Sequence, residues 1–364
     1  MKGNLLITSL LGLLLLLSAC GNNVSSTDSE DEDTLSIYTS IYPLEDFTKK
    51  IGGSHVNVTT LIPPGADSHT YEPTSREVLD IAKADAFIYN GLGMESYAEN
   101  IHDTLKNEDV LMVIASEGVE ALTHEHNHEH EHGEEEHNHE HEHEHGEEEH
   151  DHEHEHEHGE EAHNHEHEHG HGEEEHDHEH EEGNEHEHNN GDEDPHIWLD
   201  PHRAILLAEN IKDSLVNLKP DAKEEFEKNF EALKSDLEAL DEQFHHLVET
   251  KENPEMIVSH AAYGYWEESY GIKQIPIAGL SSSQEPSQSE LAQLIKLAKD
   301  KNFKYVIFEQ NVTPKVAEVI REEINAEPLY LHNLSTLTAD DLDNNEDYFS
   351  LMKRNLETLD KALQ

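Results

Sequence analysis

Three histidines in this chain stand where a folded α/β protein would bind a ligand. His69 follows one predicted strand, and His260 directly follows another; open α/β sheets bind ligands just past the carboxyl ends of their strands. His196 lies in the segment Asp194-Pro-His-Ile-Trp-Leu-Asp-Pro201, which follows a long histidine-rich tract. Neutral imidazole is the commonest protein ligand for zinc-like ions. Singly, each histidine would more often be a hydrogen-bonded structural residue, but together, beside the tract, they predict a site for a divalent transition metal.

The tract runs from His124 to Asn190 and alternates histidine with glutamate. Between His124 and His188 it holds 25 of the chain's 34 histidines and 29 acidic residues, with no Lys or Arg. Its apolar content is a single alanine, so it cannot form a core, and its repelling carboxylates predict a disordered, extended insertion. His-rich tracts are typical of metal binding. We interpret the tract as a shallow collector of metal ions, with a tolerated low-complexity expansion as the alternative, because a 13-residue unit recurs four times.

The elements that must position these histidines alternate between strands and helices. Strands are predicted at 35–38, 56–62, 86–90, 110–114, 256–259, 273–277, 304–308 and 329–331, with helices between them. This alternation predicts mostly parallel sheets flanked by helices. From Asp221 to Val248, apolar residues recur at steps of four and three, which predicts one helix about 40 Å long at roughly 1.5 Å per residue. We therefore predict an α/β protein of two lobes joined by one long rigid helix.

The N-terminus indicates the compartment. Lys2 precedes a short apolar run that ends in Leu17-Ser-Ala-Cys20. The run is too short to remain as a membrane-spanning helix and has the layout of a secretory signal. Leu-Ser-Ala-Cys resembles a bacterial lipobox, which implies cleavage before Cys20 and lipid attachment to its sulfur, on the extracytoplasmic face of the cell membrane; an uncleaved anchor is the alternative. Cys20 is the only cysteine, which excludes intrachain disulfides and thiolate metal ligands.

The predicted segments follow from these features, and the charge limits the partners. The segments are a signal peptide at 1–19, a lipidated tether at 20–33, an N-terminal α/β lobe at 34–220 with the disordered metal-binding loop at 124–190, a linking helix at 221–249 and a C-terminal α/β lobe at 250–364. The formal net charge is −60, of which the tract supplies −29. Such a chain is repelled by nucleic acid and by anionic lipid surfaces. Nucleic-acid binding is therefore excluded, and a soluble body that attracts cations is favoured.

Four motifs resemble those of a known family. They read Gly65-Ala-Asp-Ser-His-Thr-Tyr-Glu-Pro73, Asp194-Pro-His-Ile-Trp-Leu-Asp-Pro201, Ser259-His-Ala-Ala-Tyr-Gly-Tyr265 and Gly279-Leu-Ser-Ser-Ser-Gln-Glu-Pro286. In this order they resemble the zinc-uptake solute-binding lipoproteins of bacterial ABC transporters, over essentially residues 34–364, and that family carries a His-rich loop where this chain has the tract. The resemblance implies a metal site in the cleft between two lobes, delivery of the ion to a membrane permease, and His69, His196 and His260 as ligands. We expect a monomer.

The resemblance also bears on the choice of metal. Manganese-binding relatives tend to place carboxylates in the second half of the site, where this chain has His260. Three neutral imidazoles suit Zn²⁺, whereas Mn²⁺ prefers carboxylate-rich sites, so zinc is predicted and a manganese receptor is the alternative. Many relatives add a carboxylate after the last strand, where this chain has Ser335, a poor zinc ligand. Glu309, at the end of strand 304–308, is then a fourth ligand or a hydrogen-bond partner behind the ligands, and water is the other candidate.

Two functions of other classes compete with a receptor. Three histidines with an open position resemble catalytic zinc, so a zinc-dependent hydrolase is considered, although the chain has no His-Glu-x-x-His helix beside the ligands. A surface zinc-sequestration or adhesion protein, in which the tract does the binding, is the second. The leading prediction is a non-enzymatic, lipid-anchored receptor that passes extracellular Zn²⁺ to an ABC importer. Its affinity should fall as the pH drops through roughly 6.5, because protons compete for the imidazoles.

Overall fold

The computed structural model describes residues 34–123, 193–281, 283–311 and 314–363. The predicted signal peptide, Cys20 with its tether, and the histidine-rich tract lie outside the described residues. The parts of the chain that should carry the metal site, by contrast, are described.

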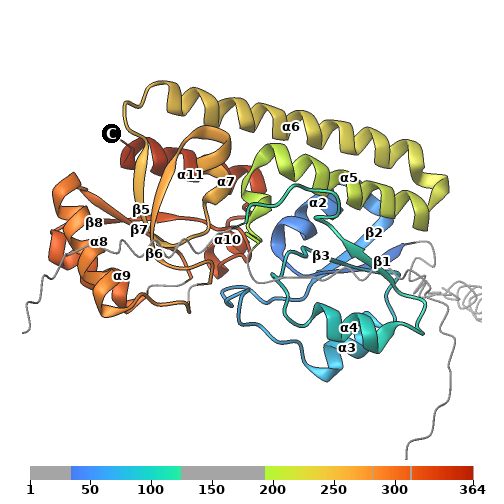
Figure 1. Ribbon diagram of the computed structural model, residues 1–364. Coiled ribbons are helices and arrows are strands. Elements are labelled where there is room, and N and C mark those ends of the chain that lie inside the picture. The colour runs from blue at the N-terminus through green and yellow to red at the C-terminus, as the bar shows by residue number, and fades with distance from the viewer. Residues whose placement is uncertain (1–33, 124–192, 282, 312–313, 364) are drawn as a thin grey trace, which may run out of the picture. The chain divides into compact units, whose positions relative to one another are not determined.

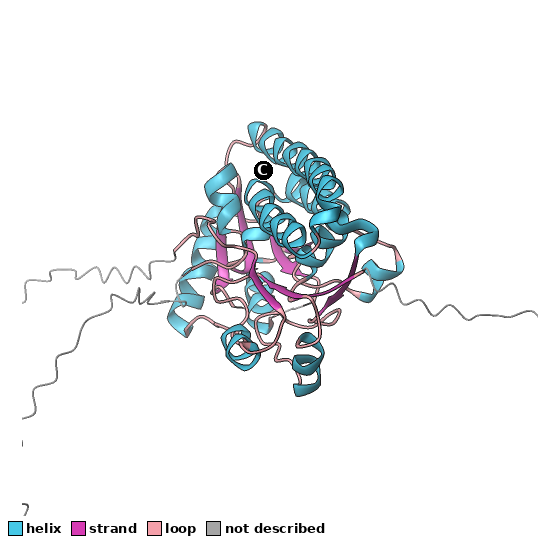
Figure 2. Cartoon of the chain, turned by 90° about the vertical axis from the view of Figure 1, so that its right-hand side faces the viewer, coloured by secondary structure: helices cyan, strands magenta, loops and turns pink. Residues whose placement is uncertain are grey.

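The N-terminal lobe is built on a parallel sheet of four strands in the order β2-β1-β3-β4. Its strands are β1 (Leu35–Thr39), β2 (Val56–Thr60), β3 (Ala86–Tyr89) and β4 (Leu111–Ile114). Its helices are α2 (Tyr42–Gly52), α3 (Ser75–Ile81), α4 (Ala98–Leu105) and α5 (Pro201–Leu218). The strands are short and largely apolar, which is typical of a parallel sheet covered by helices, and Figure 2 shows helices on both sides of the strands.

The C-terminal lobe repeats this plan with the order β6-β5-β7-β8, again parallel. Its strands are β5 (Glu255–His260), β6 (Lys273–Ala278), β7 (Tyr305–Glu309) and β8 (Glu327–Leu331). Its helices are α7 (Gly264–Tyr270), α8 (Gln288–Lys301), α9 (Lys315–Ile324), α10 (Ala339–Asp343) and α11 (Tyr348–Ala362). In this order β7 lies beside β5, so residues at the ends of these two strands become neighbours.

The long helix is α6 (Lys223–Glu249), which Figure 1 shows running alongside elements of both lobes. Its apolar stripe is buried at Phe226, Phe230, Leu233, Leu237, Leu240 and Phe244. The stripe packs on α2 and α5 of the first lobe and on α7 and α11 of the second. One apolar cluster contains residues of α2, α5, α6, α7 and α11, so the helix shares a core with both lobes as well as joining them. The predicted fold class, two α/β lobes joined by one long helix, is confirmed.

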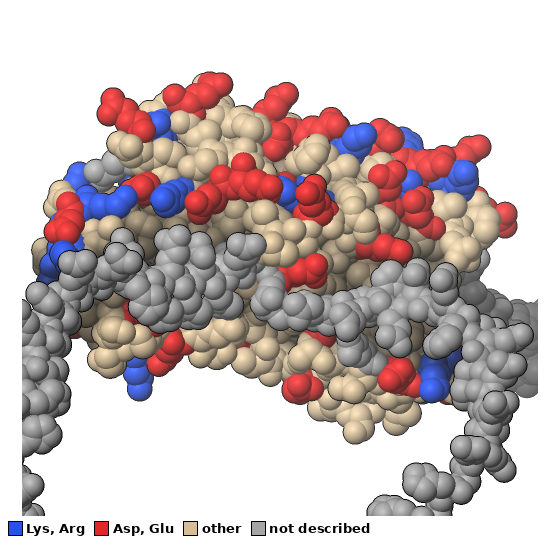
Figure 3. Space-filling model, viewed as in Figure 1, with Lys and Arg blue, Asp and Glu red and all other residues tan. Residues whose placement is uncertain are grey.

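Charged side chains of both signs are scattered over the surface of this body. On the face drawn in Figure 3, groups of acidic side chains lie among other residues, with Lys and Arg between some of them. Several pair locally, as Lys301 does with Glu255 and Lys299 with Glu323. None of the helices in the described part of the chain combines the length and the apolar character that crossing a membrane requires.

Candidate metal centre

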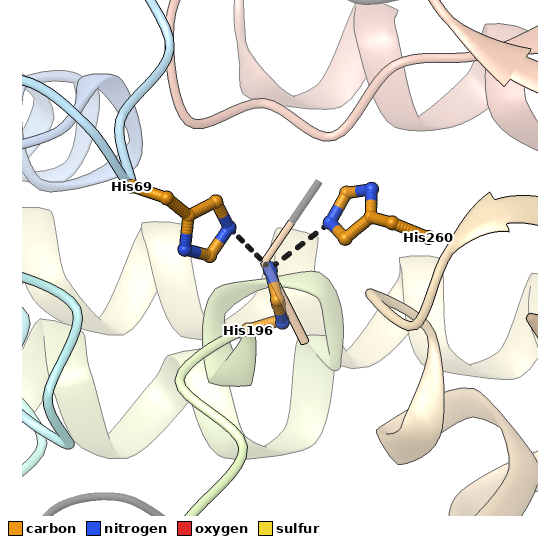
Figure 4. A group of neighbouring side chains, drawn as sticks. All are labelled: His69, His196 and His260. Atoms are coloured by element: carbon orange, nitrogen blue, oxygen red, sulfur yellow. Dashed lines mark hydrogen bonds between the residues drawn. The ribbon is translucent and has the colours of Figure 1, made fainter. Parts of the chain in front are cut away.

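The three predicted ligands come together from three separate segments. His69 lies in the loop after β2, His196 just precedes the turn Ile197–Leu199, and His260 is the last residue of β5. The Nε2 atom of His196 is 3.2 Å from Nε2 of His69 and 3.4 Å from Nε2 of His260. Figure 4 shows the three rings pointing toward one another. One nitrogen from each ring lies within 4.8 Å of a nitrogen of each of the other two, close enough for the three to bind one ion.

Two carboxylates fix the tautomers of two of these rings. Asp194 Oδ1 is 2.8 Å from Nδ1 of His196, and Glu309 Oε1 is 2.9 Å from Nδ1 of His260. Each carboxylate can only accept, so each Nδ1 carries a proton, and when the ring is neutral its Nε2 presents a lone pair. Two such lone pairs repel each other unless a proton or a metal ion lies between them. Zinc–nitrogen bonds of about 2.05 Å at a tetrahedral angle place two ligand nitrogens about 3.3 Å apart, which is the spacing found here.

The electrostatics of the rings agree with a cation site. Burial lowers the pKa of His69 well below its usual value, and the neighbouring His196 and His260 lower it further. Burial also acts to lower the pKa of His260, but the Glu309 carboxylate outweighs it and the net pKa is raised. The pKa of Glu309 is correspondingly lowered, because the charge of His260 outweighs the effect of burial. His69 is therefore neutral at neutral pH and can offer its lone pair to a metal.

The His69 loop is held through its backbone. Asp67 Oδ1 accepts the His69 N–H at 2.9 Å. Gly65, in the left-handed region at φ +79°, donates its N–H to the carbonyl of Leu337 at 2.8 Å, and the Thr336 hydroxyl donates to the carbonyl of Ala66 at 3.2 Å. The loop between β2 and α3 is thus bonded to the loop after β8, which belongs to the other lobe.

The segment that carries His196 is held by aromatic donors of the C-terminal lobe. It runs between two prolines, outside any long helix or strand, so its carbonyls need partners from elsewhere. The Tyr265 hydroxyl donates to the carbonyl of Asp194 at 2.6 Å, the Trp266 indole to that of Leu199 at 2.7 Å, and the Tyr348 hydroxyl to that of Trp198 at 2.7 Å. His196 therefore has a buried, fully supported backbone.

A small cavity lies beside His69 and His260, lined also by Asp67, Ser335 and Glu309. Glu309 is buried and already has partners: the His260 ring, the Asn333 amide at 2.7 Å and the Tyr263 hydroxyl at 3.4 Å. The Ser335 hydroxyl donates to Asn333 Oδ1 at 3.0 Å. Among the described residues, the cluster that could hold a metal contains three histidines and no carboxylate.

The other histidines outside the tract lie elsewhere. His332 is buried, with Nδ1 accepting the N–H of Leu334 at 2.9 Å and Nε2 beside Asp341 at 3.0 Å, so it fixes its own loop. The histidines predicted to be surface residues are partly or fully exposed: His55, His102, His202, His245 and His246.

Sequence reasoning missed the role of Asp194. The chain contains Asp-x-His three times, at Asp67-Ser-His69, Asp194-Pro-His196 and Asp200-Pro-His202. In the first two copies the aspartate Oδ1 accepts the backbone N–H of the histidine, at 2.9 and 3.0 Å. In the third copy Asp200 Oδ1 instead accepts the N–H of Arg203 at 2.8 Å, so this local side-chain-to-backbone bond cannot be assigned from the spacing alone.

Fold and site together define a two-lobed α/β protein with an imidazole-rich metal centre between its lobes. The family described as "ZnuA: Zinc-uptake complex component A periplasmic" matches residues 37–362. The chain is 33% identical over 350 residues to the high-affinity zinc uptake system protein ZnuA of Bacillus subtilis, covering 96% of this chain and 94% of that protein. The chain therefore belongs to the ZnuA family, and the resemblance inferred from its four motifs is confirmed.

Two further relatives support this assignment. The zinc-binding lipoprotein AdcA of Streptococcus pneumoniae is 34% identical over 361 residues, which cover 98% of this chain but 60% of that longer protein. The solved structure of the Zn(II)-bound ZnuA-like domain of AdcA superposes with a TM-score of 0.65 at 29% identity, covering 91% of this chain and 99% of the domain. This chain thus corresponds to the ZnuA-like part of the longer relative.

Proposed function

We propose that this protein is an extracytoplasmic receptor that captures Zn²⁺ between its two lobes and delivers it to an ABC-type import permease. The observation that carries the proposal is the convergence of three imidazoles, with Nε2 of His196 at zinc-ligand spacing from Nε2 of both His69 and His260. Membership of the zinc-uptake family supports it. The names of the relatives favour zinc over manganese, and a solute receptor over a hydrolase, as the function of this fold.

In this proposal His69, His196 and His260 are the protein ligands. Asp194 and Glu309 act behind them by keeping the Nδ1 protons in place, so that both Nε2 atoms stay available. Glu309 is an orienting residue and not the fourth ligand, because the His260 ring, Asn333 and Tyr263 already occupy its oxygens. Water in the cavity beside Ser335 completes the coordination.

The remaining parts of the proposal concern the place of the protein in the cell. Cys20 carries the lipid that anchors the mature chain at the cell membrane, residues 20–33 tether it, and the permease is its membrane partner. The chain acts as a monomer without enzymatic activity, with lobes at 34–220 and 250–364 joined by the helix of 221–249. The histidine-rich tract, which lies outside the described residues, remains a predicted collector of zinc.

Zinc binding by single-residue variants tests the site. His260→Ala should abolish the one tight zinc, measured by competition with a chelator strong enough to strip shallow sites. His245→Ala, which removes an exposed imidazole on α6, is the matched control and should keep it. Fluorescence of Trp198, whose ring lies 5.4 Å from that of His196, reports occupancy of this site separately from the tract. Retention of a tight zinc by His260→Ala would refute the ligand assignment.

Deletion of residues 124–190 separates a receptor from a sequestration protein. The receptor should keep its one tight zinc after the deletion, because its ligands lie outside the tract. A sequestration protein should lose nearly all of its bound zinc. Mn²⁺ titrated in parallel should bind more weakly than Zn²⁺ to the deleted chain.

A further inference from the structure

A buried carboxylate lies at the carboxyl end of β3, in a loop that contributes none of the three histidines. Glu95 is 5% exposed. Its Oε1 accepts the backbone N–H of Asn90 at 2.9 Å, and its Oε2 accepts that of Gly91 at 3.0 Å. Successive backbone N–H groups in a tight turn can form a concavity that binds an anion, and here the anion is a side chain of the same loop.

The turn that surrounds Glu95 requires unusual backbone angles. Gly91 has φ +84° and Gly93 has φ +72°, and Leu92 between them is also left-handed, at φ +56°. A side chain at Gly91 would come within 2.7 Å of Ile114 and Ser116, so that position requires glycine. The left-handed conformation of Leu92, within three successive positive φ values, is energetically unfavourable for a residue with a side chain. The hydrogen bonds from the Asn90 and Gly91 N–H groups to the Glu95 carboxylate offset that cost.

The side chain that this turn displays is Asn90, which is fully buried. Its Nδ2 donates to the carbonyl of Pro195 at 3.0 Å, across 105 positions of sequence. Pro195 is the residue before His196, and the carbonyl of Asp194 on its other side accepts the Tyr265 hydroxyl at 2.6 Å. The peptide units on both sides of Pro195 are therefore held from different lobes, Asn90 acting from the first and Tyr265 from the second.

Besides the two N–H groups of the turn, the Glu95 carboxylate also faces the Ser40 side chain, which directly follows β1. Burial raises the pKa of Glu95, although its hydrogen bonds oppose the shift. Glutamates that remain accessible to solvent do the comparable task of capping helices elsewhere in this chain, as Glu77 and Glu290 do in their capping boxes. Burying a carboxylate is far more expensive than exposing one, which indicates that the Asn90 turn must be held more rigidly than a helix end.

We propose that Glu95 and Asn90 form a positioning relay for His196: the carboxylate fixes the turn, and the turn aims the Asn90 amide at the Pro195 carbonyl, which sets the orientation of the metal-binding ring. Neither residue touches the ion. The inference rests on the proposed function, since it assigns the relay to the zinc site.

Two variants of the full-length chain test the relay. Glu95→Gln replaces one acceptor oxygen with a donor that faces a backbone N–H, and Asn90→Ala removes the bond to Pro195 while leaving the carboxylate in place. Each should weaken the tight zinc site by roughly 10–100-fold, the usual effect of losing a partner behind a metal ligand. Competition with a strong chelator and Trp198 fluorescence measure the change. If Glu95→Gln does not fold, Asn90→Ala still decides the result.

A double-mutant cycle distinguishes a relay from separate structural roles. If Glu95 acts through Asn90, then Glu95→Gln combined with Asn90→Ala should bind zinc as weakly as Asn90→Ala alone, because residues that act in series are not additive. Asp46→Asn is the control, since Asp46 is also a buried carboxylate but pairs with Lys50 within α2. It should lower the urea midpoint without changing zinc affinity.

The outcomes separate the relay from the function on which it rests. Wild-type zinc affinity in Asn90→Ala, or additive losses in the double variant, would overturn the relay while leaving the receptor intact. Absence of a tight zinc site in the wild-type chain would instead overturn the proposed function itself.

Discussion

His196 and His69 contribute to the same cluster but are supported in different ways. His196 is 1% exposed, its ring is bonded to Asp194, and its backbone is held by donors from both lobes. His69 lies on a surface loop and is held through its backbone, by Asp67 within the loop and by the loop after β8. The comparison shows two ways of positioning a ligand. For His196 the fold fixes the orientation of the imidazole ring itself, whereas for His69 it fixes the backbone of the loop that carries the ring.

Substitution of the two aspartates gives the largest expected difference between these regions. In Asp194→Asn the amide can present either its oxygen or its NH₂ group to His196 Nδ1, so the tautomer with the proton on Nδ1 is no longer fixed. Zinc affinity should fall roughly 10–100-fold. Asp67→Asn keeps an oxygen for the His69 N–H and should cost less than tenfold. Chelator competition on the two variants side by side measures the ratio. Equal losses would show that the supports are equivalent and would remove the distinction.

Removing one hydroxyl should give a smaller effect, on stability. Tyr265→Phe deletes the bond to the Asp194 carbonyl and leaves that buried group unpaired; the same hydroxyl also accepts the N–H of Leu122 at 3.3 Å. Such a loss typically costs about 1–3 kcal/mol, to be measured from urea unfolding of the zinc-free protein. Ser269→Ala, on the same helix α7, serves as a comparison. A Tyr265→Phe chain as stable as wild type would show that this support of the His196 segment is dispensable.

Much of this architecture could be predicted from sequence, because parallel sheets leave a clear alternation of apolar strands and amphipathic helices. Each of the eight predicted strands is found in the described part of the chain, within a few residues of its predicted bounds. The helix α10 was not predicted, because five residues are too few for an apolar period; its start is set by a capping box in which Thr338 and Asp341 bond reciprocally. Local side-chain chemistry, and not periodicity, decides such short elements.

The clustering of the three histidines was predictable from sequence, whereas their hydrogen-bond partners were less so. Strand ends identified His69 and His260, but the role of Glu309 depended on the order of the strands. His260 and Glu309 are the last residues of β5 and β7, and they meet because β7 lies beside β5. Sequence spacing does not determine which strands are neighbours, so the sequence left Glu309 as either a ligand or a partner. The Asn90–Pro195 hydrogen bond joins residues on either side of the histidine-rich tract, so local sequence patterns could not predict it either.

The loop that supports His69 provides the last and smallest test, through its pH dependence. Asp341 accepts bonds from His332 Nε2 at 3.0 Å, from the Thr338 hydroxyl at 2.6 Å and from Arg354 at 2.9 Å. Burial acts to raise the pKa of Asp341, but these hydrogen bonds outweigh it and hold the pKa well below its usual value. A carboxyl group whose pKa is lower in the folded state than in the unfolded chain stabilises the fold above the unfolded pKa of about 3.9, and this contribution is lost as the pH falls toward the folded value.

The difference in unfolding free energy between wild type and Asp341→Asn should therefore be constant from neutral pH down to about pH 5 and should shrink below about pH 4. Asp340→Asn, which changes the exposed neighbour in the first turn of α10, should show a small difference at every pH. Urea unfolding of the zinc-free chains between pH 3 and pH 7 measures both.

Because Thr336 and Leu337 of this loop hold the backbone at Ala66 and Gly65, Asp341→Asn should also weaken zinc binding, but less than Asp194→Asn does. A larger loss of zinc affinity in Asp341→Asn than in Asp194→Asn would contradict this expectation. It would show that the loop after β8 determines zinc affinity more strongly than the contact between Asp194 and the His196 ring.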